Sequence, residues 1–292
     1  MKTSLSHLPQ IKQEQILQIV EIIKVAAAPE KIILFGSYAE GNYVEHRYTG
    51  KGGILYEYIS DYDFLVVTKE NKIKEYELDD IVRSKTEQYN TPVNLQIHEI
   101  DYINEGLEFG QYFFGDIVKG GILLYDTGNV NFAEPRELTP AEEKLISQKY
   151  FDMWFNTASN FLNFSTHAFS TLKDENKPLS DAAFLLHQAT ERFYYTALLV
   201  FTGYKPKTHN LLKLRKLAKH LSEELFLIFP VETNKYAKHL FDLLKRGYID
   251  ARYKDDYEIT EEELISLLQK IELMKNIVHK ICSQQIESFS NS

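Results

Sequence analysis

Four residues in the first half of the sequence have the types and the spacing needed for chemistry on phosphate groups. Gly36-Ser37 follows one apolar run, and Asp61 and Asp63 open the next. Side chains two residues apart on a strand share a face, so the two carboxylates should project together, where Mg²⁺ would relieve their repulsion. A glycine-serine turn that starts a helix lets backbone N–H groups approach a phosphate. This pattern predicts metal-assisted nucleotidyl transfer, with Gly36 and Ser37 binding nucleotide and Asp61 and Asp63 as catalytic metal ligands.

The elements that must position these residues follow an α/β pattern over residues 1–134. Short apolar runs predict strands, and stretches with helical periodicity predict the helices between them. Expected strands are 31–35, 61–68, 92–98 and 121–125, and expected helices are 11–27, 73–88 and 101–119. A glycine-rich segment at 43–58 predicts an inserted β-hairpin. The first domain is therefore expected to contain a mixed sheet with helices.

Strand signals nearly vanish after residue 135. Thr139-Pro140 is a typical helix start, and Pro178, Pro206 and Pro230 fall at expected breaks. Helices are expected up to about residue 173 and at 181–202, 208–221, 232–248 and 260–286. The predicted fold class is thus α+β, with a mixed-sheet domain at 1–134 followed by an all-α bundle at 135–292.

Composition narrows the class of protein. The 292 residues include one cysteine, Cys282, which excludes an intrachain disulfide and favours a reducing cytoplasm. No apolar run reaches the ~18 residues of a membrane helix, and no signal peptide is recognisable, so we expect a cytoplasmic protein without membrane partners.

All of the net charge of −9 falls in residues 1–134, whereas 192–222 carries seven basic residues and no acidic one. RNA is therefore not a favoured partner of the whole chain.

The string ILFGSYAEG, followed by SDYDFLVV, resembles the nucleotidyltransferase superfamily that includes polymerase beta, kanamycin nucleotidyltransferase and the minimal nucleotidyltransferases. The resemblance covers about 15–126. It implies that Mg²⁺ is the cofactor, in a site that could hold two ions. It also implies that a nucleoside triphosphate, preferably ATP, is the donor substrate and that a small-molecule or protein hydroxyl is the acceptor.

Two features depart from that superfamily. Glu40 stands where a basic residue is usual, and no third carboxylate follows on the strand expected at 92–98. Asn94, Gln96 and His98 form the polar face of that strand and are expected to line the same cleft. The missing carboxylate favours an alternative, a catalytically weakened nucleotide-binding regulatory protein.

Two segments of the second half, FLLHQATERF at 184–193 and TGYKPKTHNL at 202–211, resemble the HEPN domain, named for nucleotide binding in higher eukaryotes and prokaryotes. The resemblance covers about 140–285 and rests on His187, Gln188, Glu191, the segment 206–210 and Ala251-Arg252-Tyr253. A buried hydrogen-bond network would equally explain the polar side chains of the first segment.

The basic loop within that resemblance is a candidate phosphate-binding segment. Thr208 or Asn210 is suited to cap the next helix, whereas His209 has no such structural role. Lys205, Lys207 and His209 are therefore expected to bind the nucleotide, with the loop facing the metal–phosphate cleft.

Ribonuclease activity is a further hypothesis, because some HEPN domains cleave RNA with an Arg and a His that lie a few residues apart in the sequence. Arg215 and His220 are the candidate pair here. The sequences that this chain resembles commonly lack that motif, so a toxin–antitoxin-like ribonuclease fusion remains an alternative that we do not favour. The sequence leaves homo-oligomerisation open.

Overall fold

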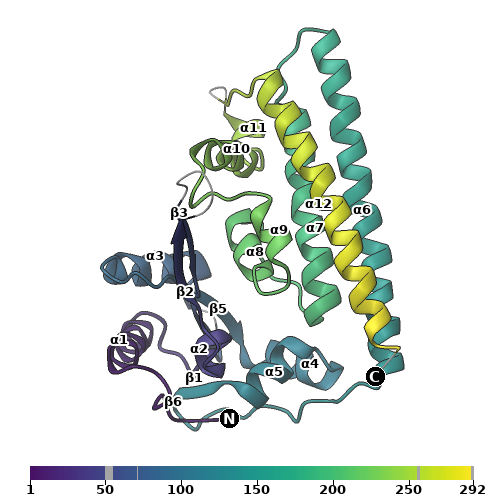
Figure 1. The fold of residues 1–292 in the computed structure, drawn as a ribbon. Coiled ribbons are helices and arrows are strands. Elements are labelled where there is room, and N and C mark those ends of the chain that lie inside the picture. The colour runs from purple at the N-terminus through teal and green to yellow at the C-terminus, as the bar shows by residue number, and fades with distance from the viewer. Residues whose placement is uncertain (50–54, 71, 255–256, 291–292) are drawn as a thin grey trace. The chain divides into compact units, whose positions relative to one another are not determined.

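The computed structural model of the protein describes residues 1–49, 55–70, 72–254 and 257–290 (Figure 1). The chain forms two compact units, Met1–Glu137 and Leu138–Ser292, called here unit 1 and unit 2. Unit 1 combines a mixed sheet with helices and unit 2 is helical, so the predicted α+β fold class is confirmed. Within the described ranges, no helix has an apolar stretch that could cross a membrane.

Unit 1 is built on a four-stranded sheet in the order β5-β4-β1-β6. Strand β1 pairs antiparallel with β4 and β6, whereas β4 and β5 run parallel. The strands are β1 (Lys31–Phe35), β4 (Tyr62–Thr68), β5 (Val93–Glu99) and β6 (Ile122–Asp126). Each lies within one residue of the predicted range, because the apolar runs that predict them are buried in the sheet.

One face of this sheet forms the main core of unit 1. Helices α1 (Gln10–Ala27) and α3 (Glu75–Thr86) contribute their apolar sides to it, including Ile16 and Val82. The alternating residues Tyr62, Phe64 and Val66 of β4 point into the same core. The intervening residue Asp63 therefore belongs to the opposite face.

The helical stretch predicted at 101–119 is two helices. Gly110 adopts a left-handed conformation with φ 89°, which ends α4 (Ile100–Phe109) before α5 (Tyr112–Gly120) begins. Both helices lie next to the sheet, because α4 contacts β5 and α5 contacts β1. They therefore border the sheet near the polar residues predicted on β5.

Strands β2 (Glu45–Thr49) and β3 (Leu55–Ile59) pair antiparallel, and the glycine turn expected between them lies outside the described residues. Reciprocal contacts close the base of this pair: Ser60 N donates to Val44 O at 2.8 Å, and Val44 N donates to Ser60 Oγ at 2.9 Å. Glu45 also accepts from Tyr38 Oη at 3.0 Å. The chain is thus fixed immediately before Asp61.

Unit 2 is dominated by three long helices that lie side by side (Figure 1). They are α6 (Pro140–Asp174), α7 (Ser180–Thr202) and α12 (Glu261–Ser288). Helix α7 is buried along most of its length and forms the centre of the core. The predicted start of α6 is confirmed, because Thr139 and Glu142 form a capping box and Pro140 occupies the first turn.

The shorter helices of unit 2 differ more from the prediction. Helix α8 (Leu211–Ala218) is shorter than the predicted 208–221, because the Asn210 side chain accepts from Leu212 N and Lys213 N and so fixes its start. Helix α10 (Lys235–Arg246) was expected. Two short helices, α9 (Glu223–Leu227) and α11 (Asp250–Tyr253), were not predicted, since four or five residues carry no readable periodicity.

Candidate functional site

The pairing of β1 with β4 brings the glycine-serine turn next to the aspartates. Phe35 lies opposite Asp63 in the antiparallel register. Gly36 and Ser37 therefore leave β1 at the sheet edge where Asp61 leads into β4. Gly36, Ser37, Asp61 and Asp63, called the Gly-Asp site below, therefore lie at the same end of the paired strands.

Gly36 has two reasons to be glycine. Its φ is 69° and its ψ is −156°, a backbone conformation that strains residues with a side chain, and a Cβ added to it would lie 2.8 Å from Asp63 Oδ2. The following turn is the short helix α2 (Ser37–Glu40), which ends at Gly41 with φ 84°. Gly36 thus lets the backbone of the turn lie directly against the Asp63 carboxylate.

The two aspartates are buried. Asp61 is 7% exposed and Asp63 is 4% exposed. Asn94 Nδ2 donates to Asp63 Oδ1 at 2.7 Å, as expected for residues that face each other in the parallel register of β4 and β5. Two carboxylates held away from water at the start of β4 favour a bound cation.

The polar face of β5 is covered by helices, which corrects the expected open cleft. Asn94 faces Asp63, but Gln96 is 1% exposed and His98 is 5% exposed. The His98 ring packs against Tyr102 of α4 and Phe114 of α5, with ring centroids 5.1 and 5.6 Å apart. Alternation along β5 correctly predicts that Asn94, Gln96 and His98 share one face of the strand, but it does not predict that helices cover this face.

The donor set fits a Mg²⁺ ion that also takes ligands from water and phosphate. Carboxylate oxygens are what Mg²⁺ prefers, and it commonly uses only one or two of them. Ser37 Oγ is buried with no hydrogen-bond partner among the described residues, which leaves it available to a phosphate oxygen. In the part of the chain that the structure describes, no three His, Cys, Asp or Glu side chains gather closely enough to hold a metal.

Glu40, the unusual acidic residue of the turn, is exposed and accepts a hydrogen bond from Asn42 Nδ2 at 2.8 Å. It lies at the last position of α2, so its carboxylate is at the end of the helix away from Gly36. No basic side chain takes the corresponding place in the turn. Within this turn, a phosphate would therefore meet backbone N–H groups and no basic side chain.

The close approach of Gly36 to Asp63 gives a matched test of stability. Gly36→Ala and Gly128→Ala both place a side chain at positive φ, 69° and 76°, but only the Gly36 substitution meets a neighbour within 4 Å. Gly128→Ala should cost about 1 kcal/mol of unfolding free energy, and Gly36→Ala about 1–3 kcal/mol more. Hydrogen exchange of the β1 and β4 amides measures the difference. Equal protection in the two variants would contradict the contact.

The loop with Lys205, Lys207 and His209 is anchored within unit 2. Lys205 Nζ lies over the ring of Tyr195, 4.6 Å from its centroid, and over that of Trp154 at 5.5 Å. Lys207 is exposed. His209 has the structural partner that the sequence analysis did not find, because its Nδ1 lies 2.7 Å from Oε2 of the buried Glu191.

The polar residues of α7 take part in a network that the sequence only partly indicates. His187 and Glu191 are buried neighbours on the helix, as their spacing predicts. Tyr248, which sequence analysis did not single out, stacks on His187 and His209 with centroid distances of 5.1 and 4.9 Å. No local signal identifies it, since it is about 60 residues from His187 in the sequence.

Arg215 of the candidate ribonuclease pair is held by contacts within unit 2. Arg215 is fully buried and forms a bidentate pair with Glu232, with both N–O distances 2.8 Å. Its guanidinium also stacks on Phe226 at 3.7 Å from the ring centroid. His220 is exposed beyond the end of α8. The contacts of Arg215 give it a structural role and do not favour RNA cleavage by this pair.

Comparison with known proteins identifies one part of the chain. No curated protein matches it. The family model of the HEPN domain matches residues 151–281, which run from α6 into α12. The resemblance noted for the helical half is thereby confirmed, and unit 2 of this protein contains a HEPN domain.

Proposed function

We propose that the Gly-Asp site of unit 1 binds a nucleoside triphosphate with Mg²⁺ and transfers its nucleotidyl group to a hydroxyl. The observation that carries the proposal is the approach of Gly36 to Asp63, where an added Cβ would lie 2.8 Å from the carboxylate. A phosphate-binding turn and a pair of metal ligands must be adjacent for this chemistry. The β1–β4 register, which puts Phe35 opposite Asp63, supports the proposal because it brings the turn that begins at Gly36 next to Asp63.

In the proposed reaction, the acceptor hydroxyl oxygen bonds to the α-phosphorus, the bond to the pyrophosphate breaks, and the hydroxyl loses its proton to a base. Mg²⁺, when bound, would neutralise phosphate charge and polarise the phosphoryl group under attack. Asp61 and Asp63 would hold it. Gly36 leaves room for a phosphate against the backbone, and Ser37 Oγ can donate to a phosphate oxygen.

A second candidate function, nucleotide binding without transfer, is favoured by Asn94. Transferases of the superfamily that unit 1 resembles carry a third carboxylate on a later strand. Here β5 presents the neutral Asn94, whose amide already donates to Asp63. An amide supplies no negative charge to a Mg²⁺ site, so activation of the acceptor hydroxyl would be weaker. Such a protein would bind ATP as a regulatory signal.

Incubation of the full chain with α-³²P-labelled ATP and Mg²⁺ separates these possibilities. The acceptors offered would be an aminoglycoside, hydroxyl-bearing proteins and the chain itself. Transfer should label one of these acceptors and release pyrophosphate. A regulatory protein should bind ATP and release no pyrophosphate. Absence of both Mg²⁺-dependent binding and pyrophosphate release would reject the proposal.

A further inference from the structure

A buried carboxylate in unit 2 orients an exposed imidazole. Glu191 of α7 is 3% exposed, and its Oε2 lies 2.7 Å from Nδ1 of His209, whose side chain is 59% exposed. A carboxylate accepts hydrogen bonds and cannot donate them, so Nδ1 carries the proton. The other ring nitrogen, Nε2, therefore has its lone pair, and no described residue contacts it through a hydrogen bond. An imidazole that a carboxylate orients in this way can react through its second nitrogen.

The charge of Glu191 acts mainly on His209. The other nearby imidazole is that of His187, whose Nε2 lies 3.9 Å from Glu191 Oε2. Burial lowers the pKa of His187 to about 4, and its Nδ1 donates to the carbonyl oxygen of Leu244 at 3.0 Å. At pH 7 His187 is thus neutral and has no proton to offer to Glu191. Arg192 Nη1 is 3.8 Å from Oε1, too far for a hydrogen bond, which leaves His209 as the described hydrogen-bond donor to this carboxylate.

The ring of His209 is also fixed in position. It stacks on the ring of Tyr248, with a centroid distance of 4.9 Å and an interplanar angle of 21°. The backbone on both sides is anchored, because Tyr195 Oη donates to Thr208 O and the Asn210 side chain caps α8. A reactive group that is already held in one orientation loses less entropy on reaching the transition state. The imidazole of His209 is therefore preorganised as a nucleophile.

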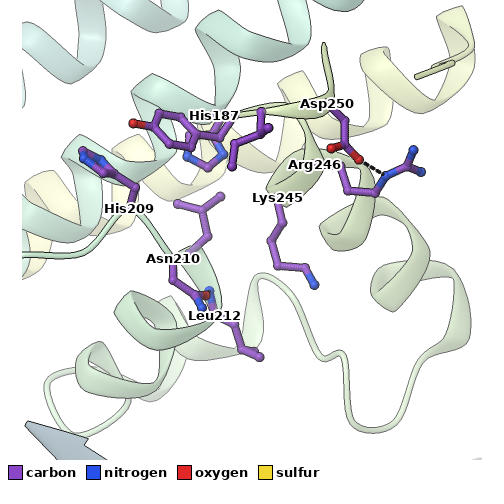
Figure 2. Close-up of a pocket in the computed structure, with 10 residues that line it drawn as sticks. His187, His209, Asn210, Leu212, Lys245, Arg246 and Asp250 are labelled. Atoms are coloured by element: carbon purple, nitrogen blue, oxygen red, sulfur yellow. Dashed lines mark hydrogen bonds and ion pairs between the residues drawn. The ribbon is translucent and has the colours of Figure 1, made fainter. Parts of the chain in front are cut away.

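Positive side chains lie around the same pocket as His209. Figure 2 shows that Lys245 and Arg246, from the end of α10, line this pocket of about 410 Å³ together with His209. Asp250 also lines it, but its carboxylate is shared between Arg246 Nε at 2.8 Å and Lys254 Nζ at 3.0 Å. The single carboxylate of the pocket lining is thus matched by two cations.

The loop that carries His209 adds further positive charge. Residues 192–222 contain seven basic residues and no acidic one, and Lys207 is exposed. Lys245 pairs with Asp242 at 2.9 Å, but both side chains are partly exposed, and such surface pairs are weak. An anionic reactant would therefore be attracted to His209. This favours a phosphoryl group over an uncharged acyl group as the electrophile.

We propose that Nε2 of His209 is a phosphorylation site that takes the phosphoryl group of a small anionic donor. The lone pair of Nε2 forms the bond to phosphorus, and the bond from phosphorus to the leaving group breaks with its electron pair. Nδ1 keeps its proton, and Glu191 offsets the positive charge that develops on the ring. The step uses no residue of unit 1. It can therefore fail without affecting the nucleotidyl transfer proposed there, and the reverse is also true.

Phosphoramidate is the probe, because its nitrogen is already protonated and leaves as ammonia without a further base. The full chain would be incubated with it, and NMR of ³¹P and ¹⁵N would identify the phosphorylated ring nitrogen. His239 is a matched internal control: its Nε2 lies 2.6 Å from Glu263 Oε1, but Glu263 belongs to the acidic first turn of α12. His209 should be phosphorylated at Nε2 at least about tenfold faster than His239. Equal rates, reaction at Nδ1 or no reaction at His209 would overturn the proposal.

Glu191→Gln tests the positioning role of the carboxylate, because it keeps a hydrogen-bond acceptor and removes the charge. It should slow phosphorylation of His209 about fivefold to tenfold and leave the rate at the exposed His167 unchanged. An unchanged rate at His209 would overturn the role of Glu191. Should this variant not fold, the ¹⁵N shifts of the native chain still decide the point. They should show a protonated Nδ1 and a lone pair on Nε2 of His209, and the opposite tautomer would overturn the proposal.

Discussion

Replacing Asp61 and Asp63 together with Asn is expected to abolish Mg²⁺-dependent ATP binding. Loss of a group that merely supports a metal ligand typically costs 10–100-fold in metal affinity, so loss of both ligand charges should cost more than about 100-fold. The fold should survive, because the amide oxygen of the Asp63→Asn side chain can still accept from Asn94, which now donates to Asp63 at 2.7 Å. Neutralising two buried like charges should not destabilise unit 1 in the absence of metal.

Calorimetric titration with ATP, in Mg²⁺ and in EDTA, measures this effect. The control is Asp80→Asn with Asp101→Asn, which changes the net charge equally at two exposed positions of unit 1. The control variant should bind as the native chain does, and circular dichroism should show that both variants are folded. Native-like affinity in the Asp61 and Asp63 variant would remove the metal role of these residues.

The second large effect is a pH dependence of the stability of unit 2 that comes from His187. Its pKa is lowered from 6.5 to about 4 in the folded protein, first because of burial. Between these values the unfolded chain binds a proton at this residue and the folded chain does not. Unfolding free energy should therefore fall as the pH drops from 7 to 4, with about 3 kcal/mol of the loss due to His187.

The contribution of His187 can be isolated from that of other titrating groups. Trp154 is the only tryptophan in the sequence and lies in α6, so its fluorescence during urea unfolding reports on unit 2. His187→Gln should remove about 3 kcal/mol of the pH dependence. His167→Gln, at an exposed position of α6, should leave it unchanged. Parallel pH profiles for the native chain and the His187 variant would show that His187 is not held neutral by burial.

The sequence by itself determined the strands of the four-stranded sheet and the long helices of unit 2. Apolar alternation and helical periodicity are local properties of the chain, and they place the four strands of the main sheet within one residue. Gly36 is required by a local backbone conformation, with φ 69°. The polar helix positions His187 and Glu191 likewise follow from spacing along one helix. Such features are readable because neighbouring residues alone determine them.

Tertiary structure alone decided which side chains are covered and with what they pair. Alternation along β5 puts Gln96 and His98 on the same face of the sheet as Asp63, but these two side chains are buried, and residues of α4 and α5 pack against His98. Likewise, the Arg215–Glu232 pair and the stacking of Tyr248 on His187 join residues from separate segments of unit 2. Burial and pairing depend on how distant segments pack, and no periodicity in one segment encodes its partner's side chains. For this reason these contacts become visible only in the folded chain.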